Sequence, residues 1–204
     1  MAALEEKTQT GHHRSKSSRR GGLQIPNRVS IEHRPKIVDQ RRRYGDWEVD
    51  LICDHNRSGY ILSAHERKSR LGKLFKLENK ASTPTAEGII ELLTGYEVHT
   101  ITFDNGLEFS KHEKVTAKLG AQGYFYAPYH SREKGGVENY NRLMRLYYPK
   151  GTDFSEITQA DLHKIETELN ERPRKVPGLG TPLELDSATE SSRQSGVQIG
   201  TILR

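Results

Sequence analysis

The order of strand-like and helix-like segments between residues 46 and 173 constrains the fold of this chain more than any other feature. Three strand-like segments come first, separated by short polar turns, at 46–53, 59–66 and 71–77. Helices and further strands then alternate, with helices expected at 83–93, 111–119, 136–148 and from 158 to just before 173, and strands at 98–103 and 122–127. Hairpins followed by strand–helix–strand crossovers predict an α/β fold, in which helices flank a mixed five-stranded sheet.

Local signals agree with this order. Residues 46–53 alternate between apolar and polar side chains, which is typical of a strand with one buried face. Thr83 is a suitable N-cap, and Pro84 suits the first position of the helix that follows. Thr158, with Asp161 three residues later, has the spacing of a capping box. We therefore expect helices to begin at these two threonines.

Positive charge is concentrated before the patterned region. The net charge is only +5, but residues 14–43 hold ten Lys and Arg residues against Glu32 and Asp39. A basic segment of this kind neutralises phosphates and releases counterions, so nucleic acid is the natural partner, although a solvated tail would have the same composition. We expect a disordered basic arm over 1–44 that contacts DNA through Arg41, Arg42 and Arg43, a core over 45–186 and a disordered tail over 187–204.

Several classes of protein are excluded by composition. No stretch approaches the roughly 20 apolar residues that span a bilayer, and the N-terminus has no apolar run that would make it a secretory signal. The single cysteine, Cys53, rules out an internal disulfide and a zinc site built from several thiolates. We expect an intracellular protein without a membrane partner.

Three carboxylates are candidates for metal ligands. Asp50 lies within the first strand, Asp104 ends the fourth, and Glu138 lies in the first turn of the helix at 136–148. Two divalent cations held by carboxylates can activate a nucleophile and stabilise the leaving oxygen at a phosphodiester, and Mg²⁺ prefers such oxygen ligands. Alternatives remain for each: Asp46 and Glu48 compete with Asp50, Asp104 could initiate a turn, and Glu138 could pair with Arg142.

The sequence resembles a known family in four segments: GDWEVD (45–50), TITFDNGLEF (100–109), ENYNRLMRLYYPKGTDF (138–154) and LNERPRKVPGLGTPLEL (169–185). They are similar to the catalytic region of the IS-thirty family of bacterial insertion-sequence transposases. Upstream, RRGGLQIPNRVSIEHRP (19–35) is similar to the family's basic linker. Val49 stands where members usually have glycine, and the tryptophan that members commonly have before the helix glutamate is missing.

This resemblance implies a ribonuclease-H-like fold and a D-D-E site formed by Asp50, Asp104 and Glu138. It implies Mg²⁺ as cofactor, with Mn²⁺ as the alternative, and DNA as substrate, with cleavage and strand transfer at insertion-sequence ends. Arg145, and with it Arg142, would contact DNA phosphate from the helix of Glu138. A homo-oligomer on DNA in the bacterial cytoplasm, associated with the nucleoid, is expected, and the family's N-terminal helix-turn-helix region is not found.

Two other functions remain open at this stage. The chain could be a truncated, inactive remnant that binds DNA and interferes with a full-length transposase, or a standalone metal-dependent nuclease. A cleavage assay with Mg²⁺ or Mn²⁺ distinguishes the three.

Overall fold

The computed structural model describes residues 25–57, 59–127, 135–174 and 180–186. Within these ranges the chain forms one five-stranded sheet in the order β3-β2-β1-β4-β5. The strands are β1 (Asp46–Cys53), β2 (Tyr60–Glu66), β3 (Gly72–Leu77), β4 (Thr100–Phe103) and β5 (Gln122–Phe125). β1 is antiparallel to β2, and β2 to β3, whereas β4 is parallel to β1 and β5 to β4. The predicted mixed sheet is confirmed.

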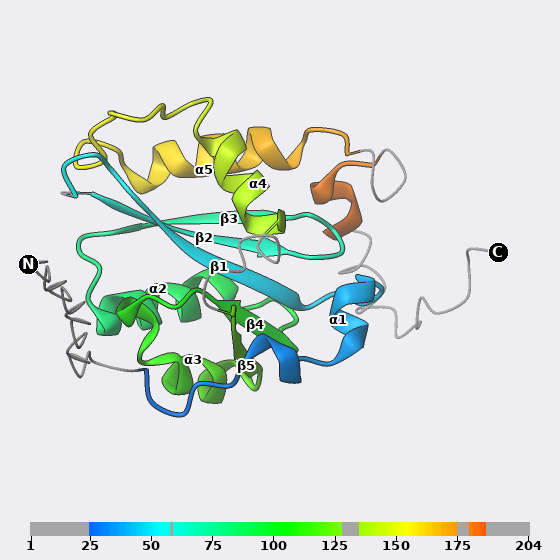
Figure 1. Cartoon of the computed structure of the whole chain (residues 1–204). Helices are drawn as coiled ribbons and strands as arrows, with labels where there is room; N and C mark the ends of the chain where they lie inside the picture. Colours follow the sequence, from blue (N-terminus) through cyan, green and yellow to red (C-terminus); the bar gives the residue numbers. More distant parts are fainter. Residues whose placement is uncertain (1–24, 58, 128–134, 175–179, 187–204) are drawn as a thin grey trace, which may run out of the picture.

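Helices cover both faces of this sheet (Figure 1). The α2 helix (Ser82–Leu93) and α3 (His112–Leu119) lie on one face, and α4 (Gly135–Met144) and α5 (Gln159–Asn170) on the other. Short helical turns, η1 (Ile31–His33), α1 (Lys36–Gln40) and η2 (Leu107–Phe109), accompany these helices, and a further helical turn lies at 182–186. No helix in the described ranges has both the length and the apolar character needed to cross a bilayer.

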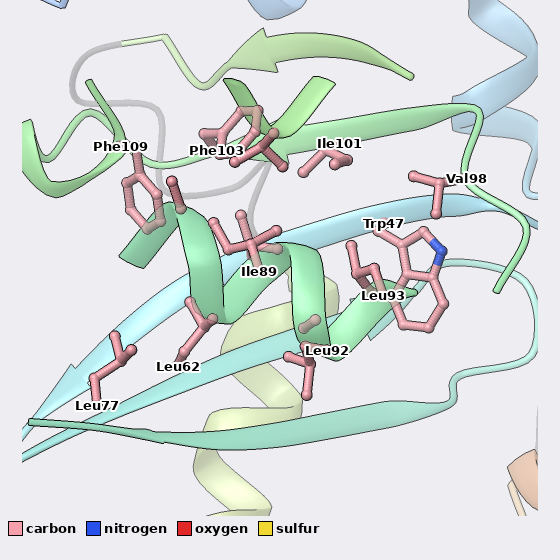
Figure 2. Close-up of a cluster of buried hydrophobic side chains, with 14 of the residues drawn as sticks. Trp47, Leu62, Leu77, Ile89, Leu92, Leu93, Val98, Ile101, Phe103 and Phe109 are labelled. Atoms are coloured by element: carbon pink, nitrogen blue, oxygen red, sulfur yellow. The ribbon is translucent and has the colours of Figure 1, made fainter. Parts of the chain in front are cut away.

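The larger apolar core lies between α2 and the sheet (Figure 2). Trp47 is only 1% exposed, and its indole N–H donates to the carbonyl of Glu97 at 3.0 Å. Ile89 and Leu93 of α2 pack against the same cluster, and both are buried. A second apolar cluster joins β2 and β3 to α4 and α5, and includes Tyr140 and Leu162.

Side chains of α5 satisfy the outer edge of β3, which is an edge strand and has no neighbouring strand on that side. Asn170 accepts from the N–H of Gly72 at 2.9 Å and donates to its carbonyl at 2.8 Å. Glu166 accepts from the N–H of Leu74 at 2.7 Å. Gln159 accepts from the N–H of Lys76, the next residue of β3 whose backbone faces outward, at 2.8 Å. Such cover removes an edge on which another chain could pair.

The expectation of a disordered arm is wrong for residues 25–44. Val38 is fully buried, and the backbone at Ser30 forms a parallel bridge with Phe125 that covers the outer edge of β5. The Arg34 side chain, 8% exposed, donates to Thr102 at 2.9 Å. Tertiary contacts therefore order a segment whose local composition favours no regular structure. Residues 1–24 and 187–204, for which disorder was also expected, lie outside the described residues.

Two helix boundaries also differ from expectation. The N-cap of α2 is Ala81 and not Thr83, and no side chain caps this end. The α4 helix ends at Met144 and not at Tyr148, because the N–H groups of Leu146 and Tyr147 bond to carbonyls three residues back, which tightens the chain into a turn. The capping box at Thr158 is confirmed.

Candidate active site

The parallel ladder between β1 and β4 determines where the two predicted aspartates lie. It pairs Glu48 with Thr102, and two residues further along each strand come Asp50 and Asp104. Continuing this register therefore brings Asp50 and Asp104 opposite one another, at the point where β4 ends. Because side chains alternate along a strand, both aspartates leave the sheet on the face that carries Glu48 and Thr102.

Each aspartate also has fixed local contacts. One carboxylate oxygen of Asp50 accepts from the N–H of Leu51 at 2.9 Å, and the other accepts from the side-chain amide of Asn141 at 2.9 Å. Asp104 accepts from the N–H of Asn105 at 2.7 Å. The Asn105 amide in turn donates to the carbonyl of Tyr126 at 2.8 Å, so it holds the loop after β4 in place.

The third predicted carboxylate, Glu138, is exposed in the first turn of α4. Asn141 lies three residues later, on the same side of the helix, and is the residue that bonds Asp50. The structure thus brings the side of α4 that carries Glu138 against β1. Arg142, the alternative partner considered for Glu138, donates to Asn139 at 2.9 Å.

The chemistry of the donors suits a hard divalent cation, but the three carboxylates do not form a closed cluster. In the parts of the chain that the structure describes, no three Asp, Glu, His or Cys side chains lie close enough together to hold a metal ion. Available oxygens include the Asn141 Oδ1, which is buried without a hydrogen-bond partner next to the Asp50 carboxylate. Carboxylate and amide oxygens are ligands that Mg²⁺ accepts. The convergence of Glu138 on the aspartates stays a prediction.

Glu48 holds the start of α4 in place, a role that the sequence did not reveal. This residue is fully buried on β1, forms an ion pair with Arg67 and accepts from the N–H of Val137 at 3.0 Å. Gly136 permits this approach, because a Cβ there would lie 2.4 Å from Glu48 Oε2. Glu48 therefore fixes the helix that carries Glu138. In the sequence, the only feature that drew attention to Glu48 was its position two residues before Asp50. That position suggested a competing metal ligand and not an anchor for α4.

Asp46, the other competitor of Asp50, also has a structural role. Its carboxylate accepts two hydrogen bonds from Arg43, both at 2.9 Å, and a third from Thr100 at 2.7 Å. The hydrogen bond to Asp46 raises the pKa of Arg43. This pairing neutralises one of the arginines that we expected to contact DNA.

The other arginines that we expected to contact DNA differ in whether their side chains are exposed or bonded to the protein. Arg41 and Arg42 are exposed at the end of α1, and Arg142 is exposed on α4. Arg145 donates to the carbonyl of Cys53 at 2.8 Å, and its guanidinium lies 5.0 Å from the ring centre of Phe154. Arg145 therefore joins the region after α4 to the end of β1.

This arrangement defines the class of protein. The sheet order and the flanking helices are those of a ribonuclease-H-like core. The catalytic core domain of bovine immunodeficiency virus (BIV) integrase superposes with a TM-score of 0.57 and 26% identity, over 73% of this chain and 97% of that domain. A chain of a simian T-cell lymphotropic virus intasome gives a TM-score of 0.58 at 17% identity, over 69% and 53% of the two chains, which supports the fold alone.

Sequence comparison narrows this class to a family. The transposase of the insertion sequence element IS4351 of Bacteroides fragilis is 45% identical over 172 residues, which are 83% of this chain and 52% of that protein. Transposase InsI of IS30C from Escherichia coli is 31% identical over 86% of this chain and 46% of its own length. Over the residues that it spans, the chain belongs to this family of insertion-sequence transposases.

Two further results bound that statement. The chain spans about half the length of the curated relatives that it matches. No protein-family model matches the sequence.

Proposed function

We propose that this chain is the catalytic core of a DNA transposase, which cuts DNA strands at the ends of an insertion sequence and joins them to target DNA. The observation that carries the proposal is the β1–β4 register, whose continuation sets Asp50 opposite Asp104. The relationship to insertion-sequence transposases supports the same reaction.

Asp50, Asp104 and Glu138 are the residues we propose as ligands of Mg²⁺, with Mn²⁺ as a substitute. A divalent ion bound there would supply the positive charge that activates the attacking oxygen and stabilises the leaving oxygen. Asn141 orients the Asp50 carboxylate through its 2.9 Å hydrogen bond. Glu48 holds α4 at its first turn and thereby restrains Glu138.

Exposed cations on α4 and after α1 would bind the DNA backbone. Arg142 lies one turn beyond Glu138 on α4, and Arg42 follows α1; both are exposed. Such contacts position the duplex without reading its sequence. We propose that the protein acts on DNA as a homo-oligomer, which light scattering with and without DNA would test.

The proposal is tested by incubating the protein with a supercoiled plasmid that carries the DNA flanking its own gene, in Mg²⁺ or Mn²⁺. Wild type should nick the plasmid and give joined products. Asp50→Asn, Asp104→Asn and Glu138→Gln should each fall to the level of a sample without protein. The matched control is Glu91→Gln, which removes an exposed carboxylate from α2 and should retain full activity.

Each other outcome has a defined meaning. Nicking that persists in Asp104→Asn would rule out the proposed site. DNA binding without any nicking by wild type would indicate an inactive remnant. Cutting of a plasmid without the flanking DNA, and without joined products, would indicate a nuclease. Calorimetric titration with Mn²⁺ provides an independent readout, since Asp50→Asn should weaken metal binding whether or not DNA is present.

A further inference from the structure

A cavity of about 350 Å³ lies beside the start of α4 and contains none of the three proposed metal ligands. Three arginines from separate segments line it: Arg41 after α1, Arg70 in the turn between β2 and β3, and Arg174 after α5. His65 of β2 and Tyr140 of α4 complete the set that matters here. Segments far apart in sequence thus bring three positive charges to one space.

These arginines have no carboxylate partner. Within the described residues, neither Arg41, Arg70 nor Arg174 forms an ion pair. Burial, and then the neighbouring Arg41, lowers the pKa of Arg70. Burial also lowers the pKa of Arg174. Glu48 and Glu66 attract Arg70 electrostatically, but Glu48 pairs with Arg67 and Glu66 accepts from Ser69. Among the described residues, the lining of the cavity therefore holds three arginines and no carboxylate.

Buried polar atoms in the cavity wall lack partners. His65 is 4% exposed and Tyr140 is 1% exposed, yet the His65 Nδ1 and the Tyr140 hydroxyl form no hydrogen bond with the protein. Most buried polar groups in folded proteins are hydrogen-bonded, so two such atoms in one wall indicate a place for a polar ligand. Burial and four nearby arginines lower the pKa of His65 to about 3, so its ring is neutral near pH 7 and has one N–H to donate.

The N-terminus of α4, which lies at the cavity, adds to the positive potential of the three arginines. Gly135 and Gly136 begin the ten-residue α4 and line the space. A helix N-terminus carries partial positive charge and favours anions. At Gly135 a Cβ would meet no atom of the other described residues within 4 Å.

We propose that this cavity binds one phosphate group of a DNA strand, held by the guanidinium groups of Arg41, Arg70 and Arg174. The identification of DNA as the carrier of that phosphate rests on the proposed function. The site would hold the DNA backbone at a fixed point beside Gly136, and so fix the position of the strand relative to α4.

Binding of a fluorescent DNA duplex is measured by anisotropy in EDTA, so that the result does not depend on strand cutting. Arg70→Gln and Arg174→Gln should each weaken binding about tenfold, because each loses a charge-assisted hydrogen bond. Each should also reduce the slope of log affinity against log salt by about 1. Arg57→Gln and Arg172→Gln are matched controls that should change neither quantity.

The controls are close matches. Arg57 also lies in a hairpin turn with a left-handed backbone (φ 57°, against 67° for Arg70). Arg172 precedes Arg174 by two residues and is exposed. If Arg174→Gln fails to fold because it loses the 2.9 Å bond to the Leu169 carbonyl, the exposed Arg41→Gln replaces it. Pocket variants that bind DNA as tightly as the controls would overturn the proposal.

The His65 ring signals in NMR report on the cavity itself. They should shift when the duplex is added, and the shift should be lost in Arg70→Gln. A shift caused by inorganic phosphate but not by duplex would mean that the cavity takes a free phosphate, and the assignment to DNA would be wrong. A chain that binds DNA through this cavity but never cuts it would contradict only the proposed function.

Discussion

β1 separates two halves of the molecule: an apolar half toward α2, and a half toward α4, here called the polar half, which has its own apolar cluster but also holds buried carboxylates. Trp47 points toward α2 (Figure 2), and Val49 belongs to the same apolar core. Glu48 and Asp50 point the other way, toward α4, where both carboxylates have named partners. β1 therefore contributes large apolar side chains to one side of the sheet and positioned carboxylates to the other.

The buried carboxylates of the polar half contribute more to the position of α4 than to the stability of the fold. Glu48 is fully buried, and taking an ion pair such as Glu48–Arg67 out of water costs about as much as the attraction returns. Its geometry, however, is specific, because the same carboxylate fixes the N–H of Val137 at the start of α4. Both halves bury apolar side chains, and the carboxylates of the polar half add the contact that sets where α4 begins.

The largest expected effect belongs to the apolar half. Trp47→Ala should lower the free energy of unfolding by about 3–5 kcal/mol, because it removes a fully buried aromatic side chain and leaves a cavity. Urea unfolding measures this, and strand cutting per folded molecule should not change. Leu146→Ala, at a side chain that is 62% exposed, should stay within about 0.5 kcal/mol of wild type.

A second effect, of intermediate size, tests the polar half. Glu48→Gln should cost about 1.5–3 kcal/mol in unfolding free energy, because hydrogen bonds to a charged group are lost. Unlike Trp47→Ala, it should also slow strand cutting at saturating metal and DNA, since α4 loses its anchor. Gly136→Ala should have the same effect on cutting, because a Cβ there would lie 2.4 Å from the Glu48 carboxylate. Full activity in both variants would contradict the division between the halves.

How well the two halves could be predicted from sequence follows the same division. The apolar half is periodic, so alternation in β1 and the helical spacing of Ile89 and Leu93 were sufficient to predict its elements. The capping box of Thr158 and Asp161 was also predictable, because it is a contact within one helical turn. Local patterns succeed where the partners lie a few residues apart.

The polar half depends on contacts that no local pattern encodes. Residues 25–44 were expected to be disordered, yet Arg34 reaches Thr102, which is 68 residues away. Glu48 was considered only as a competitor of Asp50 for the metal. Its structural role could not be predicted, because its partners Arg67 and Val137 are distant in sequence. The resemblance to transposases supplied Asp50, Asp104 and Glu138, but it did not indicate how α4 is held. That information is only in the tertiary structure.

A third test uses pH, and its site is the buried imidazole beside α4. The pKa of His65 falls to about 3 in the folded state, mainly through burial, against about 6.5 in the unfolded chain. Below pH 6.5 the unfolded state therefore takes up a proton that the folded state does not, and stability declines as pH falls toward 3. From pH 7 to pH 5 this residue should account for a loss of about 2 kcal/mol.

Comparison with His65→Leu isolates that contribution, since every other group titrates in both proteins. Urea unfolding at pH 7, 6 and 5 should show a steeper decline for wild type than for the variant. Parallel declines would mean that His65 is protonated in the folded state, and that the half of the molecule around α4 is wetter than its burial implies.

The smallest effect lies at the helix that closes the polar half. Thr158→Ala should destabilise the protein by about 1 kcal/mol, because the hydroxyl that accepts from the Asp161 N–H at 3.1 Å is lost at the start of α5. Thr158→Ser keeps that hydroxyl and should unfold at nearly the wild-type urea concentration. Since α5 contacts β3 and lies away from Asp50, strand cutting should not change in either variant. A loss of cutting in Thr158→Ala alone would show that α5, like Glu48, helps to hold α4, and that position in this half is shared between the two helices.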